Sequence, residues 1–468
     1  MCRIEVSELK RSVVLGWDGV PPGLVFNDLI DRLPNLREIL KSSTYGPLQS
    51  VSPPITVPAW MSMMTGCDPG QLGLYGFRHR TPGDYKEIWI PDSTHIKQPK
   101  VWDIVGEHGG KVIVIGVPPT YPPSEVDGVL ISGFLAPDTE RPYTYPPEIS
   151  EKISEIVGDY TLDVFYRTED KETLSAELFE MTKKRHRVAK HLLQNEEWNL
   201  FVMMEVGPDR LHHGFWRYYD VTHSRHIESE KYRSVFIRYY ELLDKQLGEI
   251  LELLPDDCVL ILASDHGAKE REGVFCINQW LYNQGLLALK SEPSSPTSFE
   301  DLDIDWKHTK AWAWGGYYAR IFINLEGYER EGCVPHDEYE QFRDTLAQML
   351  LSIRGPNGES WENIVDKPED IYHECNGEYP DLMLYLDDLH WRASGGLGYD
   401  SVYFYESDNG PDDAIHDWNG IYVIHFPEQQ HSAKREQSIL DIAPTLLQYM
   451  GLKVPSYMKG KTIRSKHK

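Results

Sequence analysis

Three short apolar runs in this chain each lead into an aspartate, and this repeated pattern restricts the fold more than any other feature. The runs are residues 12–17 before Asp18, 200–208 before Asp209 and 259–264 before Asp265. Short apolar runs with β-branched residues are typical of strands buried in a parallel sheet. In an open α/β sheet, ligands bind just beyond the carboxyl ends of such strands. The pattern therefore predicts an α/β fold with a site at one edge of its sheet.

Other segments alternate between strand and helix patterns. We expect further strands at 111–116, 128–132 and 199–206, and helices at 56–65, 171–194, 228–254 and 439–450, the last closed by Gly451. Strands that alternate with helices form a parallel sheet covered on both faces. We therefore predict a doubly wound, mostly parallel central sheet with helices on both faces and inserted loops that form a small cap.

The length of 468 residues suits two or three average domains or one large α/β domain with insertions. No internal repeat or long linker interrupts the sequence, which favours a single catalytic domain over residues 1–468, with a cap or specificity insertion at about 269–375. Residues 291–305 are typical of a surface loop. The aromatic stretch 312–318 fits either core packing or the wall of a substrate cleft.

The charge limits the class of partner. The chain carries 73 acidic and 47 basic residues, a net charge of −26, which argues against a protein that coats DNA or RNA. A small anionic substrate stays compatible with this charge, because bound metal ions reverse the local field.

The termini and cysteines bear on the compartment. The first 19 residues lack the apolar core and cleavage site of a secretory signal, and no apolar run of about 18 residues predicts a membrane span. We expect reduced thiols in a cytoplasmic protein, because the six cysteines form no C-x-x-C pair. They are Cys2, Cys67, Cys258, Cys276, Cys333 and Cys375.

Histidines accompany two of the three aspartates. Asp209 and His213 lie four residues apart, which places both on one face of a helical turn. His266 follows Asp265 directly, and Gly267 permits a sharp backbone turn beside a ligand. Each pair supplies one carboxylate and one imidazole.

Two further candidates are less specific on their own. Asp18 on its own could simply stabilise a turn or cap a helix instead of binding a metal ion. His416, which precedes the apolar run 421–424, could on its own be an ordinary loop residue. Together with the two pairs, however, they supply enough oxygen and nitrogen ligands for two divalent metal ions.

Thr56 is the candidate nucleophile. Prolines precede it, and Pro58 is tolerated within a first helical turn, so we predict that Thr56 is the N-cap of a helix. In the simpler interpretation its hydroxyl caps the helix and does no chemistry. In the functional interpretation, the helix N-terminus binds a phosphoryl oxygen and a metal ion activates the hydroxyl.

These motifs resemble those of the alkaline phosphatase superfamily. The chain is most similar to the type I phosphodiesterase/nucleotide pyrophosphatase branch and to related phosphohydrolases or phosphomutases predicted in prokaryotes. The resemblance covers nearly the whole chain, and the order and spacing of its motifs make it specific. Its segments are Leu15-Gly16-Trp17-Asp18-Gly19, Thr56 with Pro58 and Met64-Thr65-Gly66, Pro208-Asp209 with His213, Ser264-Asp265-His266-Gly267, Asn278-Gln279-Trp280-Leu281, His416 with Gly420, and residues 441–446.

The resemblance implies a two-metal hydrolase of small-molecule phosphate esters, with diesters preferred. It implies that Thr56 attacks phosphorus, and that water then releases the covalent phosphothreonine. The two metals are usually zinc, and manganese in some branches. By position, one would be held by Asp18, Thr56, Asp265 and His266, and the other by Asp209, His213 and His416.

The chain departs from the family pattern at two positions. Ala59 stands where the animal pyrophosphatases carry an asparagine that contacts the phosphoryl group, and His212 replaces the usual glycine before the metal histidine. The first departure leaves nucleotide specificity open. We hypothesise that a nearby basic residue replaces the asparagine, the alternative being a solvated or paired surface charge. The candidates are Arg78, His79, Arg80 and Lys269.

Three functions are compatible with these motifs: a phosphoric ester hydrolase, a phosphomutase or phosphotransferase with the same phospho-enzyme, and a non-catalytic phosphate-ester binding protein. The complete ligand set favours an enzyme. A sulfatase would need Cys or Ser in a Cys/Ser-x-Pro-x-Arg pattern, where this chain has Thr56, Pro58 and Trp60. The leaving group and the oligomeric state stay open.

Overall fold

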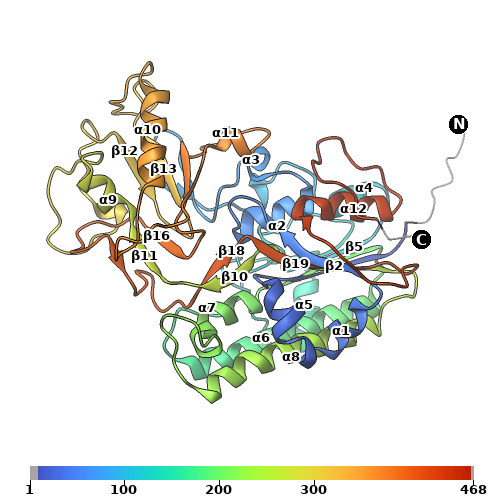
Figure 1. The fold of residues 1–468 in the computed structure, drawn as a ribbon. Coiled ribbons are helices and arrows are strands. Elements are labelled where there is room, and N and C mark those ends of the chain that lie inside the picture. The colour runs from blue at the N-terminus through green and yellow to red at the C-terminus, as the bar shows by residue number, and fades with distance from the viewer. Residues whose placement is uncertain (1–8, 465–468) are drawn as a thin grey trace, which may run out of the picture.

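Ten strands form one central sheet, and helices cover both of its faces (Figure 1). The computed structural model describes residues 9–464. The strands lie in the order β20-β2-β19-β9-β1-β8-β5-β6-β7, and β21 pairs with β2. Their bounds are β1 Ser12–Trp17, β2 Thr44–Gln49, β5 Val112–Ile115, β6 Gly128–Ile131, β7 Thr144–Tyr145, β8 Leu200–Glu205, β9 Val259–Ala263, β19 Asn419–His425, β20 Ala433–Lys434 and β21 Gln437–Ser438.

The middle of the sheet is parallel, as the apolar runs predict. Strands β9, β1, β8, β5 and β6 run in one direction, and every residue of β1, β8 and β9 is buried. The register pairs Trp17 with Glu205, the last residues of β1 and β8. Because these strands end at the same edge, Asp18, Asp209 and Asp265 follow them there. The prediction of a doubly wound, mostly parallel sheet is confirmed.

Two sets of helices enclose the sheet (Figure 1). One face carries α1 Pro34–Leu40, α5 Ile149–Val157, α6 Lys171–Asn195, α7 Gly207–Tyr219 and α8 Glu230–Leu251. The other face carries α2 Thr56–Thr65, α3 Pro69–Leu72, α4 Val101–Glu107 and α12 Ile442–Tyr449. The helix predicted at 439–450 starts as a 3₁₀ turn, Ile439–Asp441, before α12, and Gly451 follows it with a φ of 83°.

Helix α2 covers the predicted residues 56–65, but its N-cap differs from the prediction. Ile55 is its N-cap, with φ −122° and ψ 137°, and no side chain caps the helix. The prediction that Thr56 is the N-cap is therefore wrong. Pro58 occupies the third helical position, where its missing N–H costs no intrahelical bond. The Thr56 hydroxyl is consequently not used for capping.

A second hydrophobic cluster lies at the side of the molecule away from both termini (Figure 1). Its buried residues come from Phe275 to Leu397, joined by Tyr85. The elements of this region are β10 Gly267–Glu270, β11 Gly273–Cys276, α9 Ile277–Asn283, β12 Ala311–Trp314, β13 Ala319–Ile323, α10 Tyr339–Leu351, β14 Ile364–Asp366, α11 Pro368–Ile371, β15 Leu382–Tyr385, β16 Trp391–Ser394, β17 Tyr403–Phe404 and β18 Ala414–Asp417. A separate hairpin joins β3 His79–Arg80 to β4 Ile88–Trp89.

This region extends past residue 375, the predicted end of the cap, because β16 and β17 pair with β11. Strand β18 pairs with β10 and leads into β19 of the central sheet. The small sheet of β10 and β18 therefore connects this region to the edge where Asp265 lies. The division into one catalytic domain with a cap stays a prediction.

Within residues 9–464, none of the helices has both the length and the apolar composition needed to cross a bilayer. The five cysteines in the described part of the chain are free thiols: Cys67, Cys258, Cys276, Cys333 and Cys375. Cys2 lies outside the described residues.

Trp60 couples helix α2 to the end of strand β1. Its indole Nε1 donates a hydrogen bond to Asp18 Oδ2 at 2.8 Å. The Trp60 ring packs directly over Gly16, where an added Cβ would lie 2.1 Å from Cη2 of the ring. Both Trp60 and Asp18 are fully buried. The glycine therefore lets the indole approach closely enough to orient the aspartate.

We predict that Gly16→Ala destabilises the protein by about 1–3 kcal/mol, because the methyl group displaces the Trp60 ring in a packed core. The matched control is Gly23→Ala, where an added Cβ meets nothing within 4 Å. Thermal unfolding of both variants checks this expectation. Equal unfolding midpoints for the two variants would contradict it.

Candidate metal centre and active site

The seven side chains proposed from the sequence as metal ligands or nucleophile all converge at the carboxyl edge of the central sheet. They come from the loops after β1 and β9, the start of α2, the first two turns of α7 and strand β18. All are buried: Asp18, Thr56, Asp209, His213, Asp265, His266 and His416.

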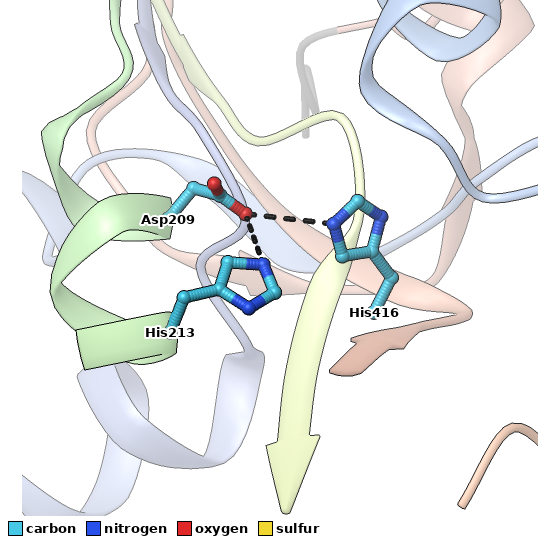
Figure 2. A group of neighbouring side chains, drawn as sticks. All are labelled: Asp209, His213 and His416. Carbon is cyan, nitrogen blue, oxygen red and sulfur yellow. Dashed lines mark ion pairs between the residues drawn. The ribbon is translucent and has the colours of Figure 1, made fainter. Parts of the chain in front are cut away.

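Among these seven side chains, two groups of three donors lie close enough to hold one cation each. In the first, Asp209 Oδ1 lies 3.3 Å from His213 Nε2 and 3.5 Å from His416 Nε2 (Figure 2). The second consists of Asp18, Asp209 and His266. Within each group the donor atoms lie within 4.8 Å of one another. Asp209 thus belongs to both groups, whereas the family resemblance assigns it to one.

Thr56 and Asp265 border the second group. The Thr56 hydroxyl oxygen and Asp265 Oδ2 each lie 3.3 Å from His266 Nε2, and Asp18 Oδ1 lies 3.7 Å from the same nitrogen. The hydroxyl therefore faces the cluster.

Each histidine is oriented through its Nδ1. The acceptors are the carboxylate of Asp412 for His213, the carbonyl of Pro54 for His416 and the carbonyl of Gly267 for His266, at 2.6, 2.9 and 2.8 Å. Since these oxygens only accept, each Nδ1 carries the proton. In the neutral ring, Nε2 then presents its lone pair to the cluster, the arrangement that metal-ligating histidines adopt.

Protonation differs among the three rings. Burial lowers the pKa of His266 and His416, so both are neutral at neutral pH. Burial has the same effect on His213, but the carboxylates of Asp412 and Asp209 outweigh it and raise the pKa of His213 well above its ordinary value. A cation at this position would displace the proton from Nε2.

The carboxylates also require compensation. Burial raises the pKa of Asp18 and Asp265 well above the usual range, and repulsion from Asp209 and Asp18 respectively adds to the effect. Within the described residues, Asp18 Oδ1 and Asp265 Oδ2 are buried without a hydrogen-bond partner. Such oxygens, facing imidazole lone pairs, are costly unless a cation binds them. The clusters therefore fit a binuclear site with nitrogen and oxygen ligands.

A cavity of about 290 Å³ opens beside Thr56, Asp209 and His416. Its wall includes Tyr317, whose ring stacks on His416 at 3.9 Å between centroids and whose hydroxyl lies 3.3 Å from His213 Nε2. Upstream in the same aromatic stretch, Trp312 belongs to the second hydrophobic cluster. Within residues 312–318, Trp312 therefore packs in a core, whereas Tyr317 lines this cavity.

Five arginines line this cavity, and of the four basic candidates from the sequence Arg78 alone is among them. For the other three the structure shows packed or paired side chains. Arg80 is buried against Glu329 and Glu378, Lys269 pairs with Asp417, and His79 stacks on Trp89. The other four lining arginines are Arg167, Arg210, Arg320 and Arg392.

Several residues at the site are absent from the sequence-based predictions. The additional arginines come from separate segments and share no local pattern. Asp412 offers a weak signal, since it lies four residues before His416. His212, by contrast, points away from the cluster, with Nε2 2.7 Å from the Tyr240 hydroxyl.

Comparison with known proteins agrees with this geometry. The model of the family "Type I phosphodiesterase / nucleotide pyrophosphatase" matches residues 12–412. His416 lies just beyond the matched residues. A search of curated proteins found no match.

Two solved structures illustrate the shared fold. An inactive variant of murine ectonucleotide pyrophosphatase/phosphodiesterase 5, in complex with AMP, is similar with a TM-score of 0.55 and 14% identity, over 97% of each chain. Phosphonoacetate hydrolase from Sinorhizobium meliloti, in complex with phosphonoacetate, is similar with a TM-score of 0.62 and 13% identity, over 95% of this chain and 96% of that one. With the family match over residues 12–412, these findings show that the chain belongs to the type I phosphodiesterase/nucleotide pyrophosphatase family of the alkaline phosphatase superfamily.

Proposed function

We propose that the protein is a metal-dependent phosphodiesterase in which Thr56 is the nucleophile. The supporting observation is the Thr56 hydroxyl, which lies 3.3 Å from His266 Nε2 in a buried cluster of carboxylates and imidazoles and also borders a cavity. One related structure contains AMP, a small phosphate ester, which supports a substrate of this class here, and the other contains the phosphonate phosphonoacetate. The free thiols support a cytoplasmic location.

The assignment of residues to the cations follows the family resemblance. Asp18, Thr56, Asp265 and His266 would hold one ion, and Asp209, His213 and His416 the other. We assign zinc before manganese, because imidazole nitrogens suit zinc. When bound, the cations would lower the pKa of the threonine hydroxyl and neutralise the phosphoryl oxygens.

The protein's own groups carry out the transfer in two displacements. Thr56 Oγ1 loses its proton and bonds to phosphorus while the bond from phosphorus to the leaving alcohol breaks, and the alcohol departs with a proton. Water then attacks the phosphothreonine, releases a phosphate monoester and restores the hydroxyl. The N-terminus of α2 favours the negative phosphoryl group throughout, because its first N–H groups have no intrahelical partner.

We predict that Thr56→Ala lowers hydrolysis of bis(para-nitrophenyl) phosphate by at least about 10³-fold, since no hydroxyl attacks phosphorus. Thr56→Ser is the matched control and keeps part of the activity. Acid-quenched wild-type enzyme should yield a phosphopeptide that contains Thr56. Normal turnover by Thr56→Ala would contradict the covalent mechanism. If the wild-type enzyme turns over only when an acceptor is added, it is a phosphotransferase instead of a hydrolase.

We predict that chelation abolishes hydrolysis and that zinc or manganese restores it, at a ratio of about two ions per chain. The raised pKa values of Asp18 and Asp265 mean that the metal-free folded state binds extra protons, so its stability falls as pH rises above the ordinary value of 3.8. The gain in thermal stability on adding zinc should therefore grow between about pH 5 and about pH 8. A gain independent of pH, or protein that binds no metal, would contradict the assignment.

We predict that Asp412→Ala weakens metal affinity about 10–100-fold, because His213 loses the acceptor that orients it. Activity measured against zinc concentration should recover at high zinc. Asp413→Ala is the matched control, since this neighbouring buried carboxylate pairs with Arg217 instead of a histidine. It should lower thermal stability without shifting the zinc dependence. Identical zinc curves for both variants would remove Asp412 from this role.

A further inference from the structure

A second cavity adjoins the one beside Thr56. Its volume is about 490 Å³, and both cavities are lined by Arg78, Gly315, Arg320, Arg392 and Asn409. Because the two share these walls, they meet at the arginines. A substrate bound at Thr56 can therefore extend past three guanidinium groups.

Two of these three arginines have no carboxylate partner in the described part of the chain. Arg392 is neutralised by Asp408, at 2.6 Å. The other arginines of the first cavity are paired too: Arg167 with Asp412, and Arg210 with Asp163 and Asp209. Between residues 9 and 464, no ion pair to an acidic side chain involves Arg78 or Arg320. In a chain with a net charge of −26, two neighbouring unpaired cations at a cavity need a reason.

The Arg320 guanidinium is desolvated and contacts the backbone of Arg78. Arg320 is only 8% exposed, and its Nη1 donates a hydrogen bond to the backbone carbonyl of Arg78. Its guanidinium lies 5.2 Å from the centre of the Trp314 ring. Burial lowers the pKa of Arg320, and repulsion from Arg78 adds to this. A buried charge beside a like charge is costly, and a bound anion would offset that cost.

We infer that Arg78 and Arg320 bind a second anionic group of the substrate, a carboxylate or a phosphate outside the phosphoryl group that reacts at Thr56. The inference rests on the proposed function, and it names the substrate class as phosphate esters that carry a further negative charge. Guanidinium groups suit both anions, because they offer paired N–H donors. The second cavity leaves room for the rest of such a molecule, along Ile88, Phe299 and Trp314.

Binding to zinc-loaded Thr56→Ala tests the inference without turnover. The probes are para-nitrophenyl alkyl phosphates of increasing chain length, each compared with the analogue that ends in a carboxylate or a phosphonate. At one chain length or more, the charged ester should bind about tenfold more tightly than its alkyl counterpart in calorimetry. The two end groups distinguish a carboxylate site from a phosphate site. If no charged ester binds more tightly than its counterpart, the inference is overturned.

Arginine variants in the same background locate the effect. Arg78→Met should abolish the advantage of the charged ester, and because Arg78 is exposed this variant should fold. Arg320→Lys should keep part of the advantage, since it retains the charge but loses the paired donors. The matched control is Arg435→Met, because Arg435 is exposed and lies outside the lining of both cavities. This variant should leave the affinity advantage of the charged ester unchanged. If the charged ester still binds more tightly in both Arg78→Met and Arg320→Met, other residues cause its affinity advantage and the inference is overturned.

Hydrolysis separates failure of this inference from failure of the proposed function. If the enzyme with Thr56 intact hydrolyses alkyl and charged esters equally and Thr56→Ala binds them equally, the proposed function stands and the anion site does not. If binding discriminates but neither ester is hydrolysed with zinc or manganese, the anion site stands and the phosphodiesterase assignment fails.

Discussion

The burial of three carboxylates in one cluster is the constraint on which the site depends. Asp18, Asp209 and Asp265 are almost completely removed from water and approach one another around His266. Such an arrangement is unfavourable with all three ionised, which explains the raised pKa values of Asp18 and Asp265. Divalent cations would relieve the repulsion and occupy the oxygens that lack donors. The unfavourable burial of these carboxylates is therefore consistent with a binuclear metal site at this edge of the sheet.

The fold keeps these groups in place through contacts that lie outside the cluster. Trp60 reaches from α2 to orient Asp18, and Gly16 provides the space that the indole needs. Asp412 and two backbone carbonyls fix the rings of the three histidines. Because each supporting group is itself buried, side-chain positions at the site follow from the packing around them.

Charge is distributed unevenly between the whole protein and its cavities. The chain is strongly acidic, yet five arginines line the cavity beside Thr56. Three of them are neutralised by aspartates, whereas Arg78 and Arg320 have no carboxylate partner in the described part of the chain. An acidic surface disfavours nucleic acid polymers, whereas unpaired arginines inside a cavity favour a small anion. Selection by charge therefore acts at the cavity rather than over the surface.

The sequence by itself determined the sheet and most of the residues of the candidate metal cluster, because buried parallel strands produce apolar runs and their ends meet at one edge. It did not determine where single side chains point. Local rules placed Thr56 at the N-cap, but the helix begins at Thr56 and leaves its hydroxyl facing the cluster. Arg78 and Arg80 look equivalent in sequence, yet Arg80 pairs with Glu329 and Glu378 while Arg78 lines the cavity. Partners some 250 residues away decide such outcomes, so only the tertiary structure contains them.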